Sequence, residues 1–338
     1  MNTNSKPFTA DEDTTLTDWI RYWFKKYKLP KIKSSTHDDY YTVIERHIIP
    51  KIGNVKLFEL SADILQDFFN EEAESGNLST GEGLSKKSIK NIRNVLNSAI
   101  TKAADLDIIA KNPMRLVEIP PLEKPEMTVL SVEEERRLLN HLINTGFEGT
   151  YDFAIFLADK FGMRNGEVAA LTFGSFDFDN MVIKVRSRII RVRNKNIESE
   201  SDSKTYLELS TPKTRESLRD IPFNEKFAEI AKEYFKAKSP RSNKKDNFIF
   251  MSKNNENADP HTINKYFQRK LRELGINKKI RFHDLRHTFA TRAIEHNVDI
   301  KSLSVILGHT SVQFTLDRYA HVLGDQKRAT MDILLSDL

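Results

Sequence analysis

The chain has 338 residues, which favours two domains over one, and 39% of them are hydrophobic, enough to form real cores. The 53 Lys and Arg residues exceed the 48 Asp and Glu residues, so the net charge is +5, which by itself indicates nucleic-acid binding only weakly. The absence of cysteine excludes disulfides, zinc–thiolate sites and cysteine nucleophiles, and it fits a cytoplasmic location. No apolar run is long enough to span a bilayer, so we expect no membrane partner.

The first part of the chain predicts a small helical domain. Residues 1–13 are polar and are expected to be disordered. Apolar residues then recur at helical spacing from Leu16 to Tyr27, which predicts a first helix with one large buried face. A second helix is expected from Ser35 or Thr36, and Pro50 and Gly53 are expected to stop it.

Two serines predict the starts of the next helices. Ser61 and Ser85 each stand directly before an apolar-periodic stretch, the position of a helix N-cap. Four helices without a strand signal predict an all-α domain over residues 14–118. The prolines that follow suit neither a helix nor a sheet, so we interpret residues 119–130 as a linker.

The second domain, expected over residues 131–324, begins at Ser131-Val-Glu-Glu134, a capping-box signature. Helices are predicted over residues 132–144, 151–160, 224–237, 262–274, 284–296, 300–307 and 312–321. Strands are predicted over residues 181–193, 207–210 and 218–221. This order predicts a mixed α+β domain with a small antiparallel sheet. Residues 325–338 form a C-terminal tail whose apolar residues would be costly to expose, so we interpret it as a helix exchanged between protomers or as a segment folded back on its own domain.

Two sets of cations are candidate DNA contacts. Lys184, Arg186 and Arg188 alternate along the chain, and Arg191 and Arg193 alternate in the shifted phase, which predicts a cationic strand face. The second set lies on one predicted helix and comprises Lys86, Lys87, Lys90 and Arg93. Each set fits a phosphate backbone and fits an ordinary solvated face equally well, so both interpretations stay open.

The chemistry is concentrated near the end of the chain. His283 and Arg286 are spaced i and i+3, so they share one helix face and address the same ligand. Taken alone, His309 after Gly308 is typical of a helix end, and Tyr319 among apolar residues is typical of a core tyrosine. Their conjunction with an upstream guanidinium supplies a nucleophile, proton carriers and cations for one phosphate.

These residues fall in segments with a recognisable pattern. The segments are Gly162-Met-Arg164-Asn-Gly-Glu167, Pro212-Lys213-Thr through Arg219-Asp-Ile-Pro222, His283-Asp-Leu-Arg286-His-Thr, and Leu307-Gly-His309 through Tyr319-Ala-His321. In this order the chain resembles the tyrosine site-specific recombinases, in the branch of phage and conjugative-transposon integrases. The resemblance implies an N-terminal SAM-like core-DNA-binding domain and a tyrosine-recombinase catalytic domain.

The resemblance also implies a role for each residue. Tyr319 would attack a DNA phosphodiester and form a 3′-phosphotyrosyl bond, with His283 as general base and Lys213 as general acid. Arg164 and Arg286 would hold the non-bridging oxygens, because planar guanidinium forks suit phosphate.

In the same pattern His309 would add a hydrogen bond, and Glu167 would orient either the first arginine or the histidine. No metal, ATP or other cofactor is implied. A second Lys-Thr pair at Lys204 competes for the acid role, and Lys213 is preferred because Ser217, Arg219 and Pro222 follow it. The stretch Asn194 to Thr205 is interpreted as a long polar insertion in a hairpin. The sequence has no room for the arm-binding domain of many integrases, so we expect either that this protein lacks that domain or that the sequence is truncated.

The implied partners are double-stranded recombination sites, a homo-tetramer on DNA, and accessory excision or bending proteins at the nucleoid of a bacterial cell. Three alternatives remain: an Xer-like resolvase of chromosome or plasmid dimers, a relaxing topoisomerase, and a non-catalytic DNA-binding protein on the same fold. A metal-dependent hydrolase is disfavoured, because Arg286 next to a dication would be repelled.

Overall fold

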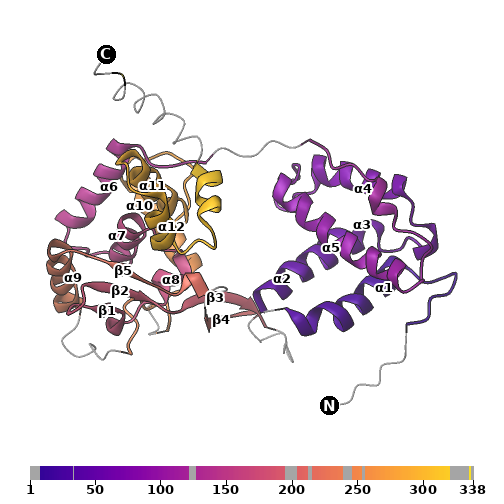
Figure 1. Cartoon of the computed structure of the whole chain (residues 1–338), viewed down its shortest axis with the longest axis horizontal. Coiled ribbons are helices and arrows are strands. Elements are labelled where there is room, and N and C mark those ends of the chain that lie inside the picture. The colour runs from indigo at the N-terminus through magenta and orange to yellow at the C-terminus, as the bar shows by residue number, and fades with distance from the viewer. Residues whose placement is uncertain are drawn as a thin grey trace. The chain divides into compact units, whose positions relative to one another are not determined.

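The computed structural model describes residues 8–32, 34–121, 127–194, 204–211, 215–238, 246–252 and 256–319, together with Leu335. The chain divides into two compact units, Met1–Glu126 and Met127–Leu338, drawn in Figure 1, and the division falls within the predicted linker. No helix among these residues has both the length and the apolar character needed to cross a membrane.

The first unit is built from four helical segments. Helix α1 (Leu16–Trp23) continues into the π-helical turn Phe24–Lys28. Helix α2 (Ser34–Thr42) runs through a π-helical stretch, Val43–Ile48, into α3 (Ile49–Ile52). Helices α4 (Ala62–Ser75) and α5 (Lys86–Asp105) complete the unit. Four helices were predicted, and the described part of this unit has these four longer segments besides three short 3₁₀ turns, Leu29–Lys31, Leu57–Glu59 and Pro113–Leu116.

Local signals account for most of the ends of these helices. The hydroxyls of Ser61 and Ser85 accept hydrogen bonds from backbone amides in the first turns of α4 and α5, so both predicted N-caps are confirmed. Of the two residues predicted to stop the second helix, Gly53 does so, because it is the C-cap of α3. Pro50 does not, because it lies in the first turn of α3, where a missing N–H costs least.

The core of the first unit includes two tryptophans. Trp19 is fully buried, and its indole Nε1 donates to the carbonyl of Ala99 in α5 at 2.9 Å. Phe8 packs against Trp19 with ring centroids 5.2 Å apart. The polar composition of residues 1–13 predicts disorder, and this is wrong for Phe8 because its ring contributes to the aromatic core; residues 1–7 lie outside the described residues.

The second unit alternates helices with short strands. Its helices are α6 (Val132–Asn144), α7 (Asp152–Phe161), α8 (Asn165–Ala169), α9 (Glu225–Lys238), α10 (Pro260–Glu273), α11 (Asp284–Glu295) and α12 (Ile300–Leu307), followed by helical residues 312–319. Its strands are β1 (Phe176–Asp177), β2 (Val182–Val185), β3 (Arg188–Arg193), β4 (Thr205–Ser210) and β5 (Arg219–Pro222). The mixed α+β class with antiparallel pairing is confirmed.

The prediction of a single strand over residues 181–193 is wrong, because this segment forms two strands that belong to different sheets. Strand β2 pairs antiparallel with β1 and β5, whereas β3 pairs only with β4. The chain leaves the first sheet at Arg186, whose guanidinium donates to the carbonyl of Arg219 at 2.9 Å instead of continuing the ladder. The two alternating runs of cations therefore do not form one strand face.

Helix α7 is the centre of the second unit. Nearly every residue in it is buried, and it packs against α11, α6 and α8 (Figure 1). The chain joins this unit before Ser131: Leu130 is fully buried, and its amide and carbonyl bond the side chains of Thr288 and Arg292. Residues 127–130 thus belong to the second unit and not to the predicted linker.

Candidate active site

Two glycines that end helices place the arginines of the site. Gly162 follows α7 and Gly308 follows α12, and both are left-handed, with φ of 58° and 63°. Arg286 Nη1 donates to the Gly162 carbonyl at 2.8 Å, and Arg164 Nη2 donates to the Gly308 carbonyl at 3.0 Å. The ends of α7 and α12 therefore fix two guanidinium groups that lie far apart in the sequence.

Gly162 is also required by the packing around it. A Cβ atom there would lie 2.6 Å from the ring of Phe289 and 2.7 Å from the side chain of Leu307. No larger residue fits unless the side chains of Phe289 and Leu307 shift, and the positive φ already favours glycine. The turn that leads into Arg164 is thus set by close packing as well as by backbone conformation.

Glu167 connects the first arginine to strand β5. Its carboxylate accepts from Arg164 Nη1 at 2.8 Å and from Arg219 Nη1 and Nη2 at 3.1 and 2.9 Å. Burial would raise the pKa of Glu167, but Arg219 and Arg164 hold it at about 2. The carboxylate therefore stays ionised and holds the Arg164 guanidinium by a hydrogen-bonded ion pair.

Arg286 is buried, and one of its guanidinium nitrogens has no hydrogen-bond partner within the described residues. Its side chain is among the largest fully buried ones, and the nitrogen in question is Nη2. Burial, followed by the charge of Arg164, lowers its pKa to about 9, so it remains protonated at neutral pH. A buried charged donor without an acceptor is costly, and an anionic oxygen would remove that cost.

Tyr319 lies behind His287. The tyrosine is fully buried, and its hydroxyl is 2.9 Å from His287 Nδ1, while His287 Nε2 is 3.1 Å from Arg318 Nη2. Burial raises the pKa of Tyr319 to about 12, although Arg286 and Arg318 oppose this, and burial lowers the pKa of His287 to about 3. Both groups are therefore neutral at pH 7.

The two predicted histidines occupy different surroundings. His283 is exposed, and its ring lies 5.3 Å from that of His287. Crowding by protein atoms, and next the charge of Arg286, lowers its pKa. Within the described residues no hydrogen bond joins His283 to Tyr319. His309 is half-buried with Nδ1 2.7 Å from the Thr315 hydroxyl, and burial lowers its pKa to about 3.

The predicted general acid is not tested by the geometry. Lys213 lies outside the described residues, as does the tail over residues 325–338 apart from Leu335. The competing Lys204 is exposed at the start of β4, and its carbonyl accepts from the amide of Asn194 at 2.9 Å.

The candidate DNA contacts differ in how available their charge is. Lys86, Lys87 and Lys90 are exposed on α5, and Arg93 is half-buried on the same helix. On the strands, Lys184 Nζ lies 2.8 Å from Asp177, Arg191 Nη2 lies 2.8 Å from Asp259, and Arg186 pairs with Asp220. These three strand cations are thus each paired with an aspartate, whereas the α5 lysines are exposed to solvent.

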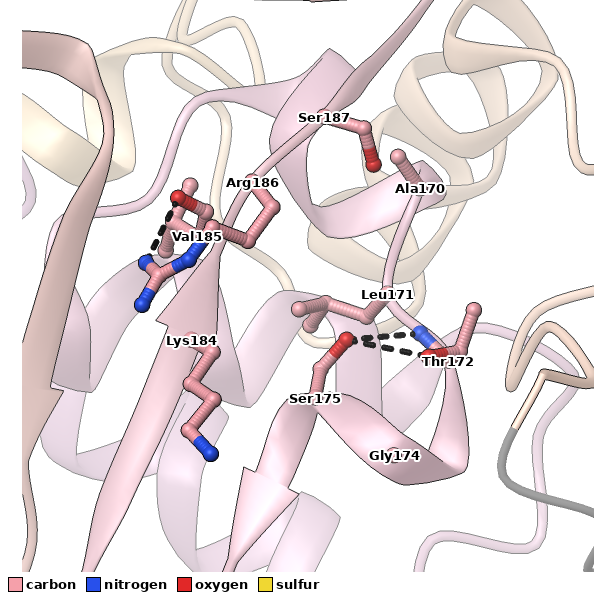
Figure 2. Close-up of a pocket in the computed structure, with 9 residues that line it drawn as sticks. All are labelled: Ala170, Leu171, Thr172, Gly174, Ser175, Lys184, Val185, Arg186 and Ser187. Atoms are coloured by element: carbon pink, nitrogen blue, oxygen red, sulfur yellow. Dashed lines mark hydrogen bonds between the residues drawn. The ribbon is translucent and has the colours of Figure 1, made fainter. Parts of the chain in front are cut away.

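A separate small cavity lies beside β2. It has a volume of about 200 Å³ and is bounded by the turn after α8 and by the end of β2, with Lys184 and Arg186 at its wall (Figure 2). Two of its lining hydroxyls lie together, with Thr172 Oγ1 3.2 Å from Ser175 Oγ, and Ser175 Oγ also accepts from the Thr172 amide at 3.0 Å. None of the residues around the two arginines lines it, so the phosphate chemistry is not assembled there.

The site combines guanidinium groups, neutral imidazoles, one shielded carboxylate and a phenol. That set can bind a tetrahedral anion and present an oxygen nucleophile to it. Arg219, His287 and Arg318 were not among the predicted site residues. Arg219 stood inside a quoted segment, but only its place beside Glu167 shows its role. His287 stood beside Arg286 in another quoted segment, but no local signal in the sequence indicated its contact with Tyr319.

Comparison with protein families agrees with the geometry. Residues 128–325 match the description "Phage integrase family", and residues 15–73 match "Phage integrase, N-terminal SAM-like domain". Among curated proteins, a "Tyrosine recombinase XerC-like" of Caldanaerobacter subterraneus subsp. tengcongensis is 28% identical over 345 residues, covering 96% of this chain and 83% of that protein.

Solved structures share the fold. The Tn1549 transposon integrase in complex with transposon right-end DNA superposes with a TM-score of 0.76 at 23% identity, covering 95% of this chain and 99% of that chain. A lambda integrase tetramer bound to a Holliday junction gives a TM-score of 0.62 at 19% identity, covering 90% and 78%. At these identities the likeness concerns architecture alone.

Proposed function

Because the chain belongs to the phage integrase family, we propose that it is a site-specific DNA recombinase in which Tyr319 is the nucleophile. A tyrosine-type DNA strand transferase is the enzyme class of this family, and the relatives include transposon integrases and Xer-type recombinases. The finer proposal is integration and excision of a mobile element.

The proposed reaction proceeds in two steps. The Tyr319 oxygen attacks the phosphorus, the bond from phosphorus to the 5′-oxygen breaks, and the strand end becomes a 3′-phosphotyrosyl ester. The phenolic proton leaves to His283, and Lys213 protonates the departing 5′-oxygen. A 5′-hydroxyl of a partner strand then attacks the ester and restores both tyrosine and a phosphodiester. Two such exchanges pass through a Holliday junction.

The observation that carries this proposal is the buried, incompletely paired Arg286 beside Arg164. Their guanidinium groups come from α11 and from the turn before α8, and both are held by carbonyls of left-handed glycines. A scissile phosphate that accepts from Arg286 Nη2 would complete the hydrogen bonding there. Each such preorganised donor is worth on the order of 10²- to 10³-fold in rate when charge develops on the phosphate.

Binding to duplex DNA is proposed to use the exposed α5 lysines and the cations of the β2–β3 region. The assembly is proposed to be a tetramer, with residues 325–338 coupling neighbouring protomers, because the lambda integrase of the same fold was solved as a tetramer on a Holliday junction. If deletion of Ala329 to Leu338 leaves assembly and strand exchange on DNA unchanged, the role of the tail is wrong.

A covalent-capture experiment tests the proposed function. Nicked genomic fragments are incubated with the wild type, with Tyr319→Phe and with Tyr206→Phe, an exposed tyrosine on β4 that serves as the control. We expect a denaturation-resistant protein–DNA adduct with the wild type and the control, and none with Tyr319→Phe. An adduct that persists in Tyr319→Phe moves the nucleophile elsewhere.

Resolution of chromosome or plasmid dimers is the second candidate, favoured by the XerC-like relative. Sequencing the captured DNA separates the two. Sites at the joined ends of an excised element support an integrase, whereas one fixed chromosomal or plasmid site supports a resolvase.

A further inference from the structure

The hydrogen bond between Tyr319 and His287 has a defined direction. Arginine carries only donors, so Arg318 Nη2 must donate to His287 Nε2, which lies 3.1 Å away. A neutral imidazole has one acceptor and one donor, and the acceptor is used by Arg318. His287 Nδ1 therefore carries the proton and donates to the Tyr319 oxygen at 2.9 Å.

The titratable groups around this pair favour the same assignment. His287 faces His283 and Arg286 on α11, and Arg318 and Tyr319 on the following helical residues, and burial and these charges all disfavour an imidazolium. A neutral His287 that already donates to the phenol cannot also accept the phenolic proton. The proton must therefore leave to another group.

The position of the phenol is withdrawn from the surface. Tyr319 is 0% exposed and packs against Ala290, Ile294 and Leu307, whereas the Arg164 side chain is 33% exposed and His283 is exposed. A DNA phosphate reaches the surface groups first. The phenol cannot contact the phosphorus of that phosphate from behind His287 unless it leaves this position.

We propose that His287 is the positioning residue of the nucleophile: it holds the Tyr319 phenol through Nδ1–H in a withdrawn position, from which the phenol must be released before it attacks. The inference rests on the proposed role of Tyr319 as nucleophile. Arg318 has its own part, because occupying Nε2 keeps the donor turned toward the phenol. Loss of one such hydrogen bond shifts the equilibrium toward the released phenol by roughly fivefold.

Two substitutions at one position separate the hydrogen bond from the bulk of the side chain. The amide nitrogen of His287→Asn lies where Nδ1 lies and can still donate to Tyr319. The amide of His287→Gln lies where Nε2 lies, so it can still accept a hydrogen bond from Arg318 but can no longer donate one to the Tyr319 phenol. Both variants fill the buried space with a polar side chain, and circular dichroism with urea unfolding identifies a variant that fails to fold.

The readout is nitration of Tyr319 by tetranitromethane in the DNA-free, full-length protein, measured by peptide mass spectrometry. Tyr206, which is 48% exposed, serves as the internal reference in the same sample. We expect a Tyr319 to Tyr206 nitration ratio about fivefold higher in His287→Gln than in the wild type, and a ratio near that of the wild type in His287→Asn. Equal ratios in the Gln variant and the wild type would overturn the proposal.

Two further readouts complete the test. Selective ¹⁵N labelling of histidine should show His287 protonated at Nδ1, and a proton at Nε2 would mean that His287 accepts from the phenol and acts as a base. On nicked DNA recovered by covalent capture, His287→Gln should form the adduct faster than His287→Asn; slower formation would contradict a withdrawn resting position. Nitration needs no turnover, so it decides the role of His287 even if Tyr319 proves not to be the nucleophile.

Discussion

Arg219 and Glu167 form a buried two-point ion pair that joins strand β5 to the turn carrying Arg164. The two Nη atoms of Arg219 lie 3.1 and 2.9 Å from the two carboxylate oxygens, and both side chains are 3% exposed. The Nε of Arg219 donates to the carbonyl of Ile306 at the end of α12. The pair therefore connects three segments that meet at the arginines proposed to bind phosphate.

We expect Arg219→Lys to slow adduct formation far more than it weakens DNA binding. Lysine keeps the charge but cannot match both oxygens of Glu167, so Arg164 loses its fixed orientation. The loss of these hydrogen bonds should lower the free energy of unfolding by about 1–3 kcal/mol. Single-turnover cleavage, DNA affinity and urea unfolding measure the three quantities.

Arg21→Lys is the matched control for that substitution. Arg21 also pairs with a carboxylate at two points, from Nε and Nη2 to Glu45 at 3.0 and 2.7 Å, but its side chain is 56% exposed. An exposed pair contributes about 0–1 kcal/mol, so this variant should unfold and cleave almost as the wild type does. Equal losses in both variants would mean that the pair with Glu167 has no special role.

Gly308→Ala should impair both stability and cleavage. The left-handed φ of 63° disfavours alanine, and the new Cβ would lie 3.0 Å from the carbonyl oxygen of Glu216. The backbone would shift the carbonyl that accepts from Arg164. Gly146→Ala is the control, because φ is 59° there and nothing lies within 4 Å. It should cost about 1–2 kcal/mol of stability and leave cleavage unchanged.

A substrate with a modified leaving group can identify the general acid. In a substrate whose 5′-bridging oxygen is replaced by sulfur, the leaving group departs as a thiolate, which needs no proton donor. Lys213→Ala should therefore be slow on ordinary DNA and regain most of the wild-type rate on the sulfur substrate. Lys204→Ala should behave as the wild type on both substrates. Rescue of Lys204→Ala instead would transfer the acid role to that residue.

Asp159 predicts a pH dependence of stability that is separate from catalysis. It is fully buried in α7, its nearest cation is Lys160 Nζ at 3.2 Å, and burial raises its pKa to about 7. An unfolded aspartate ionises near pH 3.8, so the unfolded chain releases the proton first as pH rises. The stability contributed by the protonated carboxyl is therefore present at low pH and lost between about pH 4 and pH 7.

The measurement is the difference in unfolding free energy between the wild type and Asp159→Asn across this window. The free energy of unfolding of Asp159→Asn should increase relative to that of the wild type as pH rises, by up to about 1.4 kcal/mol per pH unit. Above pH 8 the difference should increase no further. A constant difference from pH 4 to pH 8 would show that Asp159 is ionised throughout. Adduct formation should be the same in both proteins.

Local signals in the sequence were sufficient where they act over a few residues. The capping serines Ser61, Ser85 and Ser131 start helices as predicted, and α12 has the bounds predicted for it. The same reasoning failed for residues 181–193, because alternation along a strand contains no information about which partner pairs with it. Pairing to β5 and to β4 divides that run, and both partners lie later in the chain.

The sequence by itself determined the family, the two-domain plan and most of the chemical groups at the site, because those depend on residue types in a fixed order. Only the tertiary structure decided which groups touch. Arg219 shields and orients Glu167, and His287, not His283, holds Tyr319. These contacts join segments 52 and 32 residues apart, and such distances close only when the whole core packs, so no local pattern could have predicted them.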